Sequence, residues 1–210
     1  MTAVVVHTTG GGIIDRALRK GADPLQHAAE YYARPDAYAS HYLVGYGGEI
    51  ISTVAEDRVA YHAGVGRAHL EVYRKGRAIW PRYVIEGGVL AMRDRPQPHY
   101  DDWLTRWPDR AGPHELVPPP GVNTRTVGVD LLAPGYREGH PDAQVITAAA
   151  LVRDILRRKS LLPSRMTVLR HADVDPFSRS TKRGGWDPPR PAFEALCRHL
   201  GFEAWPEFVA

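Results

Sequence analysis

The chain has 210 residues, of which 43% are hydrophobic and 24% charged, enough for one domain of ordinary size. No run of about 18 apolar residues is present, so we expect no membrane span. The net charge of +3 is too small to indicate nucleic-acid binding, and the single cysteine, Cys197, excludes an internal disulfide or a cysteine-rich metal cluster.

The first predicted element is a buried strand over residues 4–6, three β-branched valines in succession. It runs into His7, two threonines and the glycines at 10–12, which we expect to form a loop. Because the chain opens on a strand, without a basic leader or a long apolar region, no signal peptide is visible. We therefore expect a protein that is cytoplasmic or exported by a leaderless route.

Two helices and a hairpin are predicted next. Residues 13–20 are compatible with a short helix, and residues 24–33 carry apolar side chains at helical spacing before Arg34-Pro35. Residues 41–45 and 49–54 flank Tyr46-Gly47-Gly48, which is typical of a β-hairpin.

The last third of the chain alternates between strand and helix patterns. Residues 126–132 and 166–169 predict buried strands, and the second strand leads directly to His171. Residues 143–159 predict the clearest amphipathic helix, and residues 192–200 a closing helix capped by Gly201.

Between these halves the pattern fades, and prolines and tryptophans dominate. A structureless loop of this length is uncommon inside a compact domain. We therefore predict a single domain over residues 1–210 with a large insertion at about 66–121 that has local structure of its own. Trp80, Trp103 and Trp107 would form its small core, or alternatively a platform for sugar stacking.

Two of the predicted strands end in histidine, at His7 and His171, and Asp187 follows in the proline-stiffened stretch Trp186-Asp187-Pro188-Pro189. Two imidazoles and one carboxylate, with one position open for water, are the composition of a catalytic zinc site. Zinc lowers the pKa of bound water to about 7 and polarises a carbonyl. The alternative is a pair of hydrogen-bonded core histidines, and the spacing alone leaves both open.

Four stretches in a fixed order point to a known family. VVVHTTGG, ASHYLVGYGGEIISTVAEDRVAYHAG, TRTVGVDLL, and MTVLRHADVDP with a following DPP together resemble the zinc-dependent N-acetylmuramoyl-L-alanine amidase family. This family (the type 2 amidase domain) includes phage lysozymes of amidase type, bacterial muropeptide-recycling amidases and animal peptidoglycan recognition proteins. The resemblance covers residues 3–65 and 122–195. It implies an α/β fold, with a mixed central β-sheet flanked by α-helices and a zinc site in a surface groove at the sheet edge.

The resemblance also implies roles for individual residues. His7, His171 and Asp187 match the three zinc ligands, with Asp173 and Asp175 as alternatives to Asp187. Asp130 occupies the strand on which recycling amidases carry a glutamate base, and it is one methylene shorter. The family's basic residue two positions before the third ligand is replaced by Gly185, and Lys182 is the substitute that we predict for it. Some members have a tyrosine where this chain has Ser40.

The resemblance further implies a groove near the metal, and we expect His62, Ser40 and Thr8 to contact substrate there. The leading interpretation is a bacterial or phage enzyme, bacteriolytic or recycling, that hydrolyses the amide between N-acetylmuramic acid and L-alanine in peptidoglycan or muropeptides. The alternative is a non-catalytic peptidoglycan-binding module. A third interpretation keeps the fold and changes the substrate: the insertion at 66–121 would route a different amide into the groove, or offer a surface to an immunity or scaffold protein.

Overall fold

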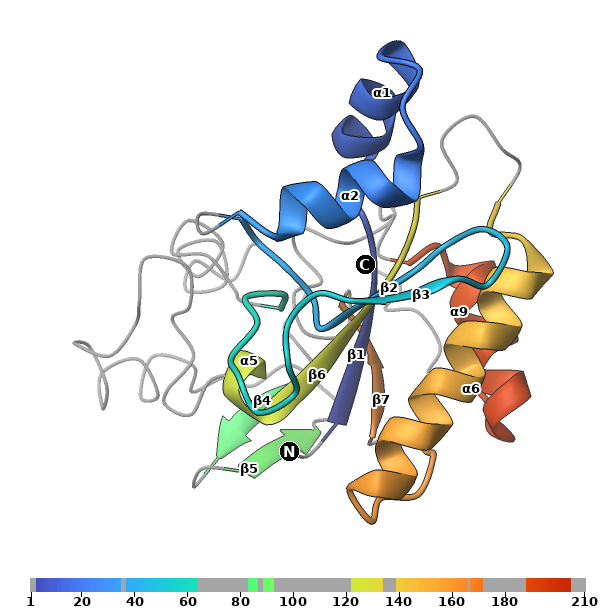
Figure 1. Cartoon of the computed structure of the whole chain (residues 1–210). Coiled ribbons are helices and arrows are strands. Elements are labelled where there is room, and N and C mark those ends of the chain that lie inside the picture. The colour runs from blue at the N-terminus through green and yellow to red at the C-terminus, as the bar shows by residue number, and fades with distance from the viewer. Residues whose placement is uncertain are drawn as a thin grey trace, which may run out of the picture.

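The computed structural model describes residues 3–34, 37–63, 83–86, 89–92, 122–133, 139–165, 167–171 and 188–204. Within these residues the main feature is a five-stranded sheet of order β3-β2-β6-β1-β7 (Figure 1). Its strands are β1 (Ala3–Thr8), β2 (Tyr42–Val44), β3 (Ile50–Ser52), β6 (Thr126–Leu131) and β7 (Val168–Arg170). β1 pairs in parallel with both β6 and β7, β2 pairs in parallel with β6, and β3 is antiparallel to β2. The predicted mixed sheet and its hairpin are confirmed.

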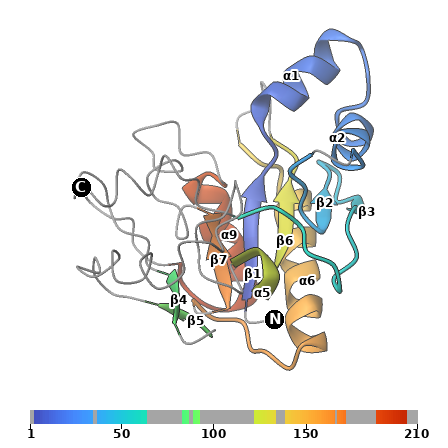
Figure 2. The same cartoon turned by 90° about the vertical axis from the view of Figure 1, so that its left-hand side faces the viewer.

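Helices pack on one face of this sheet and beyond its carboxyl ends. The helices among the described residues are α1 (Gly11–Arg19), α2 (Pro24–Tyr32), α5 (Val122–Arg125), α6 (Asp142–Arg158) and α9 (Arg190–Leu200). α6 and α9 lie side by side against one face, whereas α1 and α2 lie past the end of β1 (Figures 1 and 2). None of these described helices is both long and apolar enough to span a bilayer.

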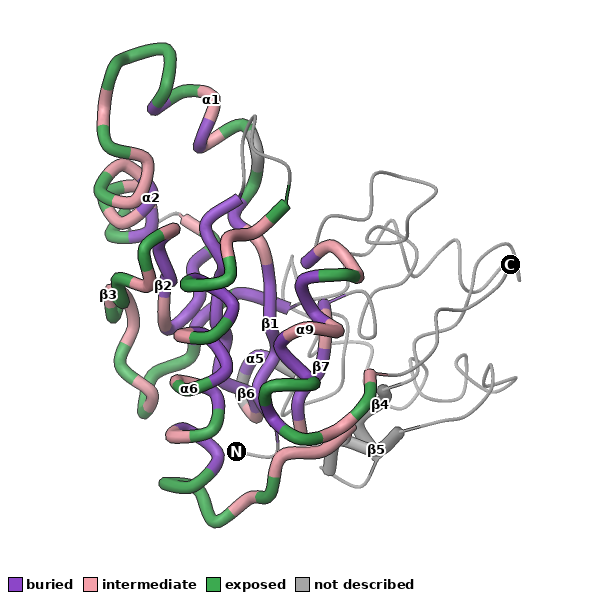
Figure 3. The backbone as a smooth tube through the Cα atoms, turned by 90° about the vertical axis from the view of Figure 1, so that its right-hand side faces the viewer, coloured by how far each residue is buried: buried purple, intermediate pink, exposed green. Residues whose placement is uncertain are grey.

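The main core lies between the sheet and the α6–α9 pair. Side chains alternate between the two faces of a strand, so every second residue of β1 and β6 points toward these helices. β1 and β6 are buried along almost their whole length in Figure 3, and the buried cluster on this face comprises Val4, Val6, Val44, Val127, Val129, Leu131 and Val168 with apolar residues of α6 and α9. Each such fully buried aliphatic side chain contributes roughly 1.5–3 kcal/mol of hydrophobic free energy.

The helix ends follow the signals in the sequence, with one exception. Asp23 caps α2 by accepting a hydrogen bond from the Gln26 amide at 2.7 Å, and Gly201 ends α9 with a positive φ of 90°. The exception is the glycine run, because α1 begins at Gly11 rather than after Gly12. The prediction of a loop over all three glycines was therefore wrong for the last two, which form the first turn of α1.

A second, two-stranded sheet lies within the predicted insertion. β4 (Tyr83–Glu86) pairs with β5 (Val89–Met92) in antiparallel register. This agrees with the expectation that the stretch has local structure. The three tryptophans and the remainder of residues 66–121 lie outside the described residues, and the boundaries of the insertion stay a prediction.

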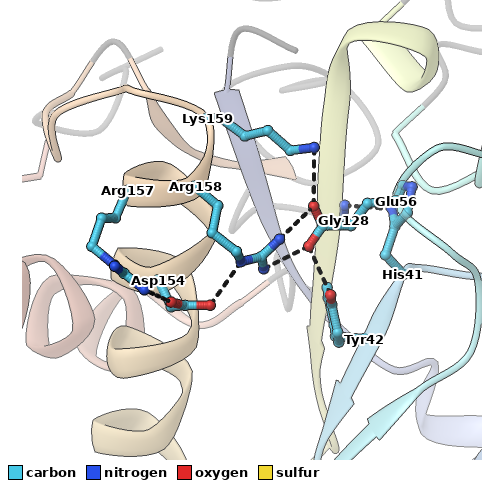
Figure 4. Close-up of polar contacts among 8 residues, drawn as sticks. All are labelled: His41, Tyr42, Glu56, Gly128, Asp154, Arg157, Arg158 and Lys159. Atoms are coloured by element: carbon cyan, nitrogen blue, oxygen red, sulfur yellow. Dashed lines mark hydrogen bonds and ion pairs between the residues drawn. The ribbon is translucent and has the colours of Figure 1, made fainter.

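α6 is joined to the sheet by polar contacts at both ends. At its start, the buried side chain of Gln144 donates to the carbonyl oxygens of Val44 and Leu132, at 2.8 and 3.1 Å. At its end, Arg158 and Lys159 contact Glu56, which follows β3 (Figure 4). Together the two contacts fix both ends of the helix relative to the sheet.

Candidate metal centre

Three polar residues of β1 and β6, His7, Thr126 and Asp130, lie on the sheet face opposite α6 and α9. His7 of β1 is directly opposite Asp130 of β6 in the parallel register. Gly128 and Thr126 precede Asp130 at intervals of two, so they share its face. The same alternation that buries valines against the helices therefore collects an imidazole, a carboxylate and a hydroxyl on the other side.

His7 and His171 come together from neighbouring parallel strands. Their Nδ1 atoms face each other at 3.0 Å, with ring centroids 4.6 Å apart, and both side chains are buried. A tetrahedral zinc ion with Zn–N bonds of about 2.0–2.1 Å would hold two imidazole nitrogens roughly 3.3 Å apart. The pair therefore fits two ligands of one such ion, and the expectation that these distant histidines converge is met.

His62 extends the pair into a row of three imidazoles. Its Nδ1 lies 2.8 Å from His7 Nε2, and its Nε2 lies 3.2 Å from the Thr126 hydroxyl. Burial drives the pKa of His62 well below the ordinary value of 6.5, and the neighbouring histidines act in the same direction. The structure thus places His62 behind His7, as a buried neutral imidazole.

His41 lies beside this row but contacts the backbone. Its Nδ1 accepts a hydrogen bond from the Gly128 amide at 3.0 Å, and its Nε2 lies 3.2 Å from the Arg58 carbonyl oxygen (Figure 4). Because a carbonyl only accepts, Nε2 carries the proton. Burial lowers the pKa of His41, and the ring links β6 to the segment after β3.

Asp130 is buried and held by two hydroxyl groups. Tyr32 of α2 donates to one carboxylate oxygen, and Ser40 donates to the other at 3.0 Å. Ser40, which we expected to contact substrate, thus contacts the proposed base. Sequence reasoning missed Tyr32, which reads as an ordinary apolar position of its helix. The signal that could have indicated it is the acid itself, because a buried carboxylate needs donors.

Thr8 points away from the row formed by His7, His62 and His171. It follows His7 in β1 and so points to the other face of the sheet, where its hydroxyl lies 3.5 Å from His140 Nε2. His140 in turn contacts Gln144 at 2.9 Å. The expected contact of Thr8 with substrate stays a prediction.

Two predicted site residues, Asp187 and Lys182, lie outside the described residues, as do Asp173, Asp175 and Gly185. Within the part of the chain that the structure describes, no group of three or more His, Cys, Asp and Glu side chains has the arrangement of a metal site. Of the three predicted ligands, the structure describes His7 and His171 and brings them together, and all three stay predictions as metal ligands.

A cavity of about 320 Å³ opens between α1 and α2. It is lined by Gly10, Gly12, Ile13, Arg16, His27 and Tyr31. Ligands of open α/β sheets bind outside the carboxyl ends of the strands, and this cavity lies just beyond the end of the strand that carries His7. Arg16, His27 and Tyr31 line the cavity with a guanidinium, an imidazole and an aromatic ring.

Solved structures of amidases resemble this chain. AmiD from E. coli, in complex with anhydro-N-acetylmuramic acid-L-Ala-D-γ-Glu-L-Lys, matches with a TM-score of 0.50 and 21% identity, over 99% of this chain and 60% of AmiD. A selenomethionine derivative of AmpD matches at 0.45 and 19% identity, over 93% of this chain and 83% of AmpD. Staphylococcus aureus AmiA, with its ligand, matches at 0.43 and 14% identity, over 95% and 70%. The likeness to AmiD supports the α/β fold.

A family model assigns the chain to a protein family, which structural likeness alone does not do. No curated protein matches the chain. The model described as N-acetylmuramoyl-L-alanine amidase matches residues 1–188, which include both strands that carry the histidine pair and the predicted third ligand. The chain belongs to the N-acetylmuramoyl-L-alanine amidase family.

Proposed function

We propose that this protein is a zinc-dependent amidase that hydrolyses the bond between N-acetylmuramic acid and L-alanine in peptidoglycan or its muropeptide fragments. Membership of the family supports the reaction. The observation that carries the zinc dependence is the approach of His7 Nδ1 to His171 Nδ1 at 3.0 Å. Two buried imidazoles that face each other with ring nitrogens are the donor set that zinc prefers.

In this proposal His7, His171 and Asp187 hold the metal. When bound, zinc would polarise the scissile carbonyl and lower the pKa of a water molecule toward 7. The burial of both imidazoles keeps competing water away from the ligand nitrogens. Lys182 would stabilise the negative charge that develops on the carbonyl oxygen.

Asp130 would transfer the proton. Its carboxylate takes a proton from the attacking water as the new carbon–oxygen bond forms, and returns it to the L-alanine nitrogen as the carbon–nitrogen bond breaks. The products are the free lactyl carboxylate and a new amino terminus. Tyr32 and Ser40 hold the carboxylate in one orientation on the face that His7 shares.

The test combines metal analysis with mass spectrometry of muropeptide digests. We expect about one zinc per chain, cleavage at the lactyl–alanine bond, and loss of both in His7→Ala and His171→Ala. His199→Gln is the matched control, because His199 is an exposed histidine near the end of α9 and should leave zinc content and cleavage unchanged.

Other results would contradict the proposal in distinguishable ways. Cleavage that survives a chelator would exclude zinc dependence while leaving the amidase activity in place. Intact lactyl–alanine bonds, together with binding to polymeric peptidoglycan that His7→Ala does not weaken, would identify a non-catalytic recognition module.

A further inference from the structure

The contacts of His62 favour a proton on one of its two ring nitrogens. Its Nε2 side faces Thr126, whose hydroxyl lies 3.2 Å away. A hydrogen bond with the Thr126 backbone raises the pKa of His62, which is the effect of a backbone carbonyl that accepts from a ring N–H. A neutral imidazole has one N–H and one acceptor nitrogen. With the proton on Nε2, the acceptor of His62 is Nδ1.

The position of the proton on His62 in turn decides which ring nitrogen of His7 is protonated. The acceptor Nδ1 of His62 lies 2.8 Å from His7 Nε2, so His7 Nε2 must be the donor. His7 is then protonated on Nε2 and carries a lone pair on Nδ1. That lone pair points toward His171 Nδ1, 3.0 Å away, where a cation would bind. Any other tautomer of His7 would place a proton between the two ligand nitrogens.

The position of His62 is itself tightly constrained. The Asn123 side-chain oxygen accepts hydrogen bonds from the backbone amides of His62 and Ala63, at 3.1 and 2.7 Å. The ring packs onto β6 at Gly128, where an added Cβ would lie 2.6 Å from His62 Cγ. Only glycine therefore permits the imidazole to reach His7 across this strand.

We propose that His62 is a positioning residue that holds His7 in the tautomer protonated on Nε2, and so keeps Nδ1 available to the metal. This differs from the contact with substrate that the sequence indicated for His62. The importance of the tautomer for metal binding rests on the proposed zinc dependence, whereas the tautomer itself does not.

The first test measures zinc affinity by competition with a chromophoric chelator. His62→Leu removes the acceptor, and we expect zinc affinity to fall about 10–100-fold, as for other partners of metal-bound histidines. His62→Asn places an amide oxygen where Nδ1 was, so most of the affinity should return. His199→Leu is the control for loss of a remote histidine. Wild-type affinity in His62→Leu, or equal losses in the Leu and Asn variants, would overturn the proposal.

The second test reads the tautomer directly in the zinc-free protein. Nitrogen-15 NMR distinguishes protonated from unprotonated ring nitrogens, and His7 should be protonated on Nε2 in the wild type and in His62→Asn. In His62→Leu we expect a mixture of both tautomers. A wild-type His7 protonated on Nδ1 would overturn the inference even if zinc binds.

A variant in β6 that keeps His62 tests the same contact between His62 and His7. Gly128→Ala should displace the imidazole and weaken zinc binding in the same range as His62→Leu, with thermal unfolding confirming that the variant is folded. If the protein binds zinc with the expected tautomer but releases no new amino termini, the proposed function fails and this inference stands. Unchanged zinc affinity in a folded Gly128→Ala variant would contradict it.

Discussion

At the scale of single residues, the strand positions of this site could be predicted and their partners could not. His7 and His171 end apolar strands, and Asp130 interrupts one, so each is conspicuous in the sequence. Tyr32 is not, and His62 is indicated only as a substrate contact, because their roles depend on contacts across 98 and 55 residues of chain. A tyrosine in an amphipathic helix looks the same whether its hydroxyl faces water or a buried carboxylate.

Tyr32→Phe should show what the hydroxyl contributes. The substitution keeps the ring but leaves one oxygen of buried Asp130 without its Tyr32 donor, which should lower the free energy of unfolding by about 1–3 kcal/mol. Urea denaturation measures this. Tyr31→Phe is the control on the same helix: its ring lies under the Arg34 guanidinium, which the change preserves, so we expect a change of less than about 0.5 kcal/mol. Equal stability of the two variants would show that the Tyr32 contact is not needed.

At the scale of elements, the end of α6 is anchored by one carboxylate. Glu56 accepts hydrogen bonds from both terminal nitrogens of Arg158 and from the Tyr42 hydroxyl, at 2.7–2.9 Å, and Lys159 lies 3.2 Å away. Burial alone would raise the pKa of Glu56, but these donors outweigh it and lower the pKa from 4.5 to about 2. The contact joins residues that are 102 positions apart in the chain, so no local sequence pattern predicts it.

The stability that Glu56 supplies should depend on pH. Since its folded pKa of about 2 is below the ordinary 4.5, its contribution is complete above pH 4.5 and disappears as the pH falls toward 2. We expect Glu56→Gln to cost about 1–2 kcal/mol at pH 6, a value reduced by the solvent exposure of Arg158 and Lys159, and less at pH 3. Urea midpoints at both pH values measure this.

Asp154→Asn is the control, because Asp154 pairs with Arg157 and Arg158 on the exposed surface of α6, where solvent screens the ion pairs and the change should have little effect on stability. A stability difference between wild type and Glu56→Gln that is the same at pH 6 and pH 3 would show that the carboxylate is not held ionised by this contact.

At the scale of the whole molecule, the sequence predicts elements better than their arrangement. The strands β1 and β6 and the helices α2, α6 and α9 lie where alternation, periodicity and capping indicated, within one or two residues. The order of the sheet could not be obtained in this way, because four of its strands pair across long stretches of chain. The family resemblance implied a mixed sheet flanked by helices but not the order of its strands, which the structure supplies.

Zinc should stabilise the whole fold if the proposal holds, because the two predicted ligands that the structure describes lie on β1 and directly after β7, which are adjacent strands. A ligand at about 1,000 times its dissociation constant adds about 4 kcal/mol to the free energy of unfolding. For a chain of this size that corresponds to a rise in Tm of roughly 10 °C. Scanning fluorimetry should record the rise with zinc, its reversal by a chelator, and its absence in His7→Ala. Magnesium, which prefers oxygen ligands, should have little effect. Equal Tm values with and without zinc would contradict a site that joins the two strands.

The position of β1 between β6 and β7 also determines when the histidine pair can first assemble. The ribosome makes His171 164 residues after His7, a delay of roughly 10–30 s at typical translation rates. Until then β1 can pair with β6 but lacks β7, and His7 lacks the second of its predicted partners in metal binding. A chain that is terminated before residue 171 therefore cannot assemble the histidine pair, because the pair needs one residue from β1 and one from the end of β7.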